Sequence, residues 1–325
     1  MITLSHSYSN IISVISILLA NRLYLSTAFS ATGTATGTRN NKITIPRPLT
    51  KCWGKYNKSR KRKLDTDDIL AYERSLINQG FSYIIGSDET GRGSIAGPVM
   101  TASCCILTLV NNDEDFTIAD LSDLPTIGLI TSNNKTGSGG NLIKDSKQLS
   151  PNERERIYEV IVNNPQIYAF SVAQRSNIEI DDTNNILAST MECFKDSSEE
   201  LAQSKLFPYI LSRQEQRQQQ MQLNEIDNNK IYSVVDGKKA PKLVTTPSFP
   251  CRPMVKADVQ VYTVALASII AKVTLDHMSE EWHKNYPEYN FQENKGYATR
   301  SHIEAIHRYG PCPLHRMTFK SLQGR

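Results

Sequence analysis

The chain has 325 residues, of which 39% are hydrophobic, so it is long enough for one large domain with additional segments. No internal repeat is visible, which excludes repeat architectures. Its formal charge of +4 is uneven: residues 1–64 contain eleven Lys or Arg and no Asp or Glu, whereas residues 65–325 contain 26 basic and 33 acidic residues, a net charge of −7. Nucleic-acid binding must therefore use a local basic surface or metal-bridged phosphates rather than overall charge.

The first 66 residues have the composition of a targeting segment. Residues 11–20 are an apolar core, too short to span a bilayer comfortably, and small residues follow around Ala28. We predict a signal-like segment over 1–29 and a transit-like basic leader over 30–66, followed by a catalytic domain over 67–325. This order resembles the bipartite presequence of complex plastids and favours a plastid over a mitochondrion. A nuclear signal or basic nucleic-acid-binding arm in the run 58–63, or a solvated segment of a cytoplasmic protein, is the alternative.

The first predicted helix, residues 70–79, leads into an apolar, β-prone run at 83–85 that ends in Asp88 and Glu89. Two adjacent carboxylates repel each other unless a hard cation lies between them, and Mg²⁺ or Mn²⁺ is the cation expected there. The turn that follows, Gly91-Arg92-Gly93, brings bare backbone and a phosphate-binding guanidinium close to any ligand. Considered alone, this stretch could also be an exposed acidic turn without a metal-binding role.

The middle of the chain predicts alternating strands and helices. Residues 98–109 have the apolar character of a buried strand, and Ser150, Pro151 and Glu153 form a capping box that opens a helix ending near residue 163. The remaining predictions are a strand at 168–172, a helix at 182–205, and two insertions, a polar loop near 111–141 and a glutamine-rich segment near 206–229.

Two further carboxylates stand at the ends of apolar runs. Residues 231–235 predict a strand that delivers Asp236, and residues 253–257 predict one that delivers Asp258. The helix predicted from 259 to 283 has an apolar first half, which leaves Lys272 as an unusual charge. A buried lysine needs a partner such as a phosphate or a carboxylate, unless it extends to water.

The last segment places Tyr297 between a glycine and a short helix, which Thr299 caps and Gly310 ends. The tyrosine ring can present itself to a sugar or base, or can belong to the core. The six cysteines lack the spacing of a zinc site and are interpreted as free thiols in a reducing compartment.

These motifs together resemble the ribonuclease HII family over roughly residues 80–320. Seven blocks occur in the family's order: Asp88 to Val99, Asp145-Ser-Lys147-Gln-Leu149, Val235-Asp236-Gly237, Lys256-Ala-Asp258, Ala267 to Thr274 including Lys272, Lys295-Gly-Tyr297-Ala-Thr299 with His302, and Gly310-Pro with His315-Arg316 and Phe319. The form Val-Asp-Gly is similar to the bacterial branch.

The resemblance implies an α/β protein with a ribonuclease H-like fold, in which helices flank a mixed central β-sheet and the C-terminal portion is helical. It implies that Asp88, Glu89, Asp236 and Asp258 converge as catalytic residues and hold two Mg²⁺ or Mn²⁺ ions. The expected substrates are RNA–DNA hybrids and duplex DNA that contains single ribonucleotides, cut on the 5′ side of the ribonucleotide to leave a 5′-phosphate and a 3′-hydroxyl.

The substrate-binding residues that the resemblance implies are backbone, aromatic and basic groups. Gly91, Arg92 and Gly93 would read the 2′-hydroxyl, and Tyr297 would stack on the next sugar. Lys147 and Lys272, with Arg316, are candidates for holding phosphates or orienting carboxylates. We expect a monomer without stable membrane association. The alternatives are a non-catalytic hybrid-binding protein, which would lack at least one carboxylate, and a resolvase that cuts DNA structures.

Overall fold

The computed structural model describes residues 70–107, 124–126, 129, 131–132, 142–143, 146–210, 230–245, 248–320 and 322. The predicted leader, residues 1–66, lies outside the described residues, as do most of the insertion at 111–141 and residues 211–229 of the second insertion. The proposed leader boundaries therefore remain predictions.

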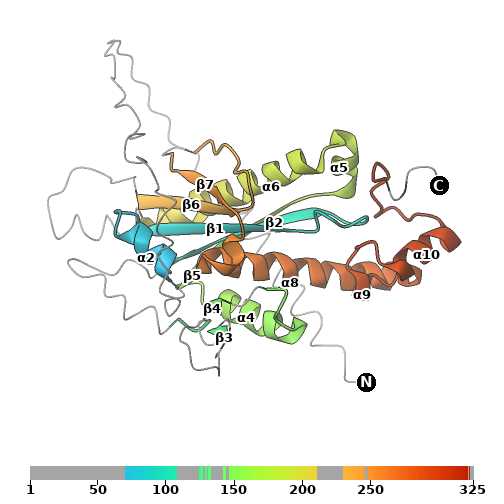
Figure 1. Ribbon diagram of the computed structural model, residues 1–325, viewed down its shortest axis with the longest axis horizontal. Coiled ribbons are helices and arrows are strands. Elements are labelled where there is room, and N and C mark those ends of the chain that lie inside the picture. The colour runs from blue at the N-terminus through green and yellow to red at the C-terminus, as the bar shows by residue number, and fades with distance from the viewer. Residues whose placement is uncertain are drawn as a thin grey trace, which may run out of the picture. The chain divides into compact units, whose positions relative to one another are not determined.

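A five-stranded mixed sheet forms the centre of the described fold (Figure 1). Its strands, in order across the sheet, are β5 (Tyr168–Arg175), β2 (Val99–Ile106), β1 (Tyr83–Thr90), β6 (Ile231–Asp236) and β7 (Cys251–Met254). Strand β2 is antiparallel to both β1 and β5, whereas β6 is parallel to both β1 and β7. This arrangement confirms the expected mixed sheet of a ribonuclease H-like fold.

Helices flank the sheet and form the C-terminal portion of the chain. They are α2 (Ala71–Ile77), α4 (Pro151–Asn163), α5 (Asn177–Thr183), α6 (Ile186–Leu201), α8 (Tyr262–Asn285), α9 (Phe291–Asn294) and α10 (Arg300–Tyr309). Figure 1 shows α6 on one face of the sheet and α8 on the other, with α4 against the outer side of α8. The predicted helical C-terminal portion is therefore confirmed.

Helix α8 approaches β1 closely because of a glycine. A Cβ atom at Gly86 would lie only 2.2 Å from the backbone nitrogen of Val264. The apolar first half of α8 is buried, as its composition predicts, and packs in the largest core cluster together with residues of β1, β2 and α4. This contact fixes α8 beside the strand that carries Asp88.

On the other face, α6 rests on the sheet through small hydroxyl side chains. Ser103 Oγ lies 2.8 Å from Ser87 Oγ, 2.9 Å from Ser197 Oγ and 3.2 Å from Ser198 Oγ, and all four serines are fully buried. Because these hydroxyl groups satisfy one another, the polar layer is not left without hydrogen bonds. Small residues here let the helix lie close to the strand that carries Glu89.

Sequence signals for helix ends were accurate where a side chain caps the helix. The Ser150–Glu153 capping box is present, and α4 spans the predicted residues. Thr299 Oγ1 accepts a hydrogen bond from the His302 amide at 3.3 Å, and α10 ends before Gly310 as predicted.

Two predictions about elements were wrong in detail. The segment predicted as one helix at 182–205 contains the end of α5, then α6, then a π-helical turn over Ala202–Leu206, because left-handed Asn184 ends α5 and Asn185 caps α6. Strand β7 ends at Met254, so Asp258 lies on the 3₁₀ turn Ala257–Val259 rather than at a strand end.

The predicted loop at 111–141 is partly ordered. Thr126 is buried, and its hydroxyl lies 2.8 Å from Tyr168 Oη and 2.5 Å from Tyr262 Oη. The short strand β3 (Thr131–Ser132) pairs with β4 (Leu142–Ile143). The polar composition of this segment did not predict these contacts, because Thr126 is a polar residue whose burial depends on hydrogen bonds.

Five cysteines in the described residues are free thiols, as predicted. Three of these thiols, on Cys104, Cys105 and Cys193, are buried. Among the helices that the structure describes, none is both long enough and apolar enough to cross a membrane.

Candidate active site

Three predicted carboxylates meet where β1 and β6 lie side by side. Because the two strands are parallel, their carboxyl ends reach the same edge of the sheet, and each of Asp88, Glu89 and Asp236 offers an oxygen within 4.8 Å of the others. Adjacent residues on a strand point to opposite faces. Asp88 accordingly lies on the α8 side and Glu89 on the α6 side, with Asp236 completing the group from the neighbouring strand.

Backbone and side-chain donors hold these carboxylates in place. Asp236 Oδ1 accepts a hydrogen bond from the Ala257 amide at 2.7 Å, which ties the end of β6 to the turn that carries Asp258. Arg92 Nη1 lies 3.0 Å from Glu89 Oε1. The guanidinium is half exposed, so Arg92 can also contact a ligand that approaches the site.

Asp88 is the buried member of the group, with 6% of its surface exposed. Burial raises its pKa to about 7, and the charges of Glu89 and Asp236 also raise it, while Lys272 and a hydrogen bond from Ser268 act in the opposite direction. Burial likewise raises the pKa of Glu89, against the effect of Arg92. Such a group of like charges is stabilised when a cation is shared among them.

Lys272 does find polar partners, although they are not phosphates. Its Nζ donates to Ser146 Oγ at 2.5 Å and to Ser268 Oγ at 3.0 Å, and the two hydroxyl groups lie 2.8 Å apart. Since Ser268 also donates to Asp88, the lysine stabilises the ionised form of this carboxylate both through space and through the serine. This geometry favours the carboxylate-orienting alternative for Lys272.

A cavity of about 710 Å³ opens on the α6 side of the acidic group. Glu89, Asp236 and Asp258 line it, together with Arg92 and Lys147. Asp258 therefore reaches the same cavity as the other predicted ligands, but it lies outside the group of three whose oxygens are within 4.8 Å of one another. Apolar side chains of α6 form part of the wall: Leu187, Met191 and Phe194.

The glycine-rich turn lies beside this cavity. Gly91 has a φ of +75°, and a Cβ atom there would come within 2.6 Å of the Pro98 carbonyl oxygen. A Cβ atom at Gly93 would lie 3.8 Å from Cε1 of Tyr297, so the tyrosine ring is a direct neighbour of the turn. Tyr297 is 42% exposed and can present its ring to a ligand. The structure thus brings together all of the predicted 2′-hydroxyl-reading and stacking residues.

Arg316 has a different role from the phosphate contact considered for it. Its side chain is fully buried and donates hydrogen bonds to the carbonyl oxygens of Gly91, Gly97 and Pro98 at 2.7 to 2.8 Å. A buried guanidinium bound to backbone carbonyls cannot reach a phosphate. Arg316 instead fixes the shape of the glycine-rich turn from behind.

The sequence interpretation missed three lysines in the cavity wall: Lys238, Lys239 and Lys256. The first two directly follow Asp236-Gly237, and this adjacency to a candidate ligand was the available signal. Lys256 adopts a left-handed conformation with a φ of +59°, and Gln260 holds its turn by donating to the Val255 and Lys256 carbonyls. Together with Arg92 and Lys147, these groups give an acidic site a basic rim.

The donor set fits a divalent metal. The three clustered groups supply hard carboxylate oxygens, which Mg²⁺ and Mn²⁺ prefer, and the raised pKa of Asp88 shows that its charge is poorly compensated by the protein alone. A mixed sheet of this order, with carboxylates gathered where its parallel strands end and a basic rim around them, defines a metal-dependent hydrolase that acts on phosphodiesters.

Comparison with known proteins identifies the family. The model of the family described as Ribonuclease HII matches residues 141–322. Ribonuclease HII of Caldanaerobacter subterraneus is 32% identical over 262 residues, covering 79% of this chain and 83% of the relative. Ribonuclease HII of Chlamydia pneumoniae is 32% identical over 78% of this chain and 91% of the relative. The chain belongs to the ribonuclease HII family and is a ribonuclease H, a hydrolytic endonuclease.

Solved structures also resemble the chain. The structure of the PCNA:RNase HII complex from Archaeoglobus fulgidus matches with a TM-score of 0.45 and 21% identity, covering 73% of this chain and 95% of that chain. The structure of Bst-RNase HIII in complex with Mn²⁺ matches with a TM-score of 0.47 and 17% identity, covering 75% of this chain and 70% of that chain.

Proposed function

We propose that this enzyme cleaves the RNA strand of RNA–DNA hybrids and cuts on the 5′ side of single ribonucleotides embedded in duplex DNA, leaving a 5′-phosphate and a 3′-hydroxyl. Such cleavage would serve ribonucleotide excision and primer removal during DNA replication. The observation that carries the proposal is the position of Tyr297 beside Gly93, in the turn that directly follows the clustered carboxylates Asp88 and Glu89. Tyr297 and the glycine-rich turn can then recognise the sugar, while the carboxylates beside them carry out hydrolysis.

Asp88, Glu89 and Asp236 would hold the metal, with Asp258 at the border of the same cavity. Two bound Mg²⁺ or Mn²⁺ ions would supply an activated water and stabilise the leaving 3′ oxygen. The exposed backbone of Gly91 and Gly93 can approach a 2′-hydroxyl closely because neither residue carries a side chain. Arg92, Lys147 and the three rim lysines can contact the phosphates that flank the scissile bond.

The test is cleavage by the full chain, with Mg²⁺ and separately with Mn²⁺, of three end-labelled duplexes: all DNA, DNA with one ribonucleotide, and an RNA–DNA hybrid. We expect one cut 5′ to the single ribonucleotide and several cuts in the hybrid. The Asp236→Asn variant, which keeps the side-chain shape but removes the charge, is expected to be inactive on both substrates.

Other outcomes would overturn the proposal. Cleavage of the all-DNA duplex would indicate a resolvase-like activity. Tight binding without cleavage under either metal would indicate a protein that only recognises hybrids.

We further propose that residues 1–66 direct the enzyme to an organelle, a plastid in preference to a mitochondrion. The support is the apolar core at 11–20, followed by an acid-free basic segment. Fusion of residues 1–70 to a fluorescent reporter tests this proposal, and a cytosolic or nuclear signal would overturn it.

A further inference from the structure

Two buried histidines lie next to Tyr297 and take no part in the chemistry described above. His302 on α10 is fully buried, and His315 in the C-terminal segment is 2% exposed. Their Nε2 atoms lie 3.1 Å apart. The rings of Tyr289 and Phe291 pack against both histidines, so water does not separate the pair.

The remaining contacts of this pair fix where its protons lie. His302 Nδ1 is 2.8 Å from the carbonyl oxygen of Tyr297, and His315 Nδ1 is 2.9 Å from the amide nitrogen and 3.1 Å from the carbonyl oxygen of Cys312. A carbonyl oxygen can only accept, so His302 must carry its proton on Nδ1 and donate it to Tyr297. In the neutral pair, His302 Nε2 then accepts from His315 Nε2, and His315 Nδ1 accepts from Cys312.

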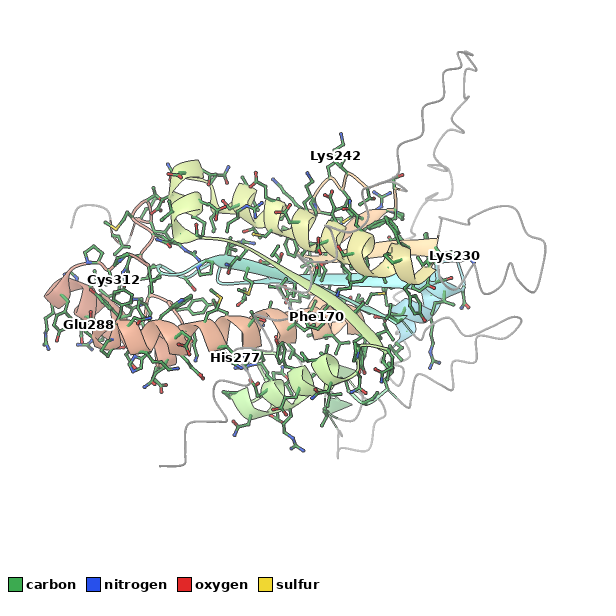
Figure 2. All side chains as sticks on the ribbon, turned by 180° about the vertical axis from the view of Figure 1, so that it is seen from behind. Phe170, Lys230, Lys242, His277, Glu288 and Cys312 are labelled. Atoms are coloured by element: carbon green, nitrogen blue, oxygen red, sulfur yellow. The ribbon has the colours of Figure 1, made fainter. Side chains whose placement is uncertain are left out.

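Burial supports the neutral assignment, because it lowers the pKa of His302 and lowers the pKa of His315 to about 4. The pair therefore forms a directed chain of hydrogen bonds that runs from the Cys312 amide through both rings to the Tyr297 carbonyl. Figure 2 shows Cys312 in the C-terminal region, near Glu288 and the α10 end of the fold.

The same C-terminal segment also holds residues 95–97, which follow the glycine-rich turn. The Gly97 amide donates to Leu314 O at 2.8 Å, and the Arg316 amide donates to Ile95 O at 2.9 Å, on either side of His315. The Ile95 amide in turn donates to Gly296 O at 2.8 Å, next to Tyr297. Residues 95–97 are thus bonded both to Gly296, the residue before Tyr297, and to the neighbours of His315.

We propose that His302 and His315 are positioning residues for ribonucleotide recognition, because their hydrogen-bond chain fixes the backbone of Tyr297 and hence the place of its ring relative to Gly93. This inference rests on the proposed function. The acidic group receives no contact from either histidine among the described residues. Loss of the chain therefore changes which substrate is accepted more than it changes the rate of hydrolysis.

Two substitutions at one position separate this role from a structural one. In His302→Asn, the amide nitrogen can take the place of Nδ1 and still donate to Tyr297, but the contact with His315 is lost. In His302→Gln, the longer side chain can reach His315, but the donor to Tyr297 is lost. Both variants remove the same ring from the same packed environment. A purely structural role therefore predicts similar effects for both.

The experiment measures kcat and KM of the full-length protein and both variants on the single-ribonucleotide duplex and on the RNA–DNA hybrid, with Tyr297→Ala as a reference. Thermal unfolding confirms that each variant is folded. Loss of one hydrogen bond predicts a rise in KM of about tenfold for His302→Gln on the single-ribonucleotide duplex, with kcat within about threefold. The hybrid is expected to be affected less. His302→Asn keeps the donor to Tyr297 but breaks the chain at His315, so it is expected to show a smaller rise in KM than His302→Gln.

The outcomes distinguish the two proposals. If the wild type cuts the single-ribonucleotide duplex but the two His302 variants behave alike on both substrates, the positioning inference is overturned and the proposed function stands. If kcat falls equally on both substrates in His302→Gln, the inference is also overturned. If the wild type does not cut the single-ribonucleotide duplex, the proposed function fails together with the inference.

Discussion

Two buried carboxylates, in different regions of the molecule, share one electrostatic property and serve different purposes. Glu73 on α2 is fully buried, and burial raises its pKa to about 7. Asp88 on β1 is nearly as buried, and its pKa is likewise raised to about 7. A raised pKa therefore does not by itself distinguish a proposed metal-binding carboxylate from a structural one in this enzyme.

Their neighbours make the distinction. Glu73 Oε1 accepts a hydrogen bond from the Thr263 amide at 3.1 Å, at the first turn of α8, where free amide groups and the helix dipole favour a negative charge. It thereby caps a helix whose own preceding residue, Val261, has no capping side chain. Asp88 instead faces two further carboxylates. Backbone donors partly compensate the buried carboxyl group of Glu73, whereas a carboxylate that meets like charges requires a cation.

The largest effect is expected from Asp88→Asn. This substitution keeps the size of the side chain but removes a proposed metal ligand, so kcat/KM should fall by about 10³-fold or more. In EDTA the same variant should unfold at a temperature equal to or above that of the wild type, because a repulsive buried charge is gone. Steady-state kinetics and thermal unfolding test both parts, and a lower unfolding temperature would contradict the comparison.

The structural carboxylate should show the reverse pattern. Glu73→Ala removes the cap of α8 and leaves a cavity, which should lower the free energy of unfolding by about 2–3 kcal/mol. Urea unfolding measures this loss. The kcat of the folded fraction should stay within about twofold of the wild type, since Glu73 does not contact the cavity residues. Glu73→Gln, which keeps an acceptor for the Thr263 amide, is the matched control.

Sequence reasoning found Asp88, Glu89 and Asp236 because each stands at the end of an apolar run, a local pattern that survives in a single sequence. It did not find Glu73, whose partner Thr263 is 190 residues away. The same limit explains Arg316, which looked like a phosphate ligand but is buried against carbonyls of a turn more than 200 residues earlier. A contact between residues far apart in the chain leaves no local pattern in the sequence, so neither role could be predicted from it.

The fold, too, was predictable only where the signal is local. Helix α4 and helix α10 carry their own capping residues, so their limits could be inferred. Asp258 was assigned to a strand end because residues 253–255 are apolar. The chain instead turns at Lys256, whose φ is positive although the residue is not a glycine. Local signals therefore gave the elements, and tertiary contacts decided the turns between them.

The pH dependence of stability can separate the two carboxylates further. Both have a folded pKa above the unfolded value, so each binds more protons in the native state between about pH 4 and pH 7, and the stability that these two groups contribute should fall as pH rises through this window. His302 and His315, whose pKa values are lowered, contribute in the opposite direction. Mg²⁺ would bind only the ionised form of Asp88. With Mg²⁺ present, Asp88 should therefore no longer contribute to the loss of stability at higher pH, and only the contribution of Glu73 should remain. Thermal unfolding from pH 5 to 8, with EDTA or Mg²⁺, measures the difference. An identical pH dependence under both conditions would contradict the metal assignment.

The smallest expected effect tests how Asp88 is kept ionised. Ser268→Ala removes the hydroxyl that donates to Asp88 and accepts from Lys272, so the pKa of Asp88 should rise further and kcat/KM at neutral pH should fall by about three- to tenfold. In a pH–rate profile, the acidic limb should move to higher pH while the plateau at high pH recovers. Ser279→Ala is the matched control, because Ser279 is buried on the same helix and donates to the Asp276 carbonyl instead. Equal losses in both variants at every pH would show that the serine supports the helix rather than the carboxylate.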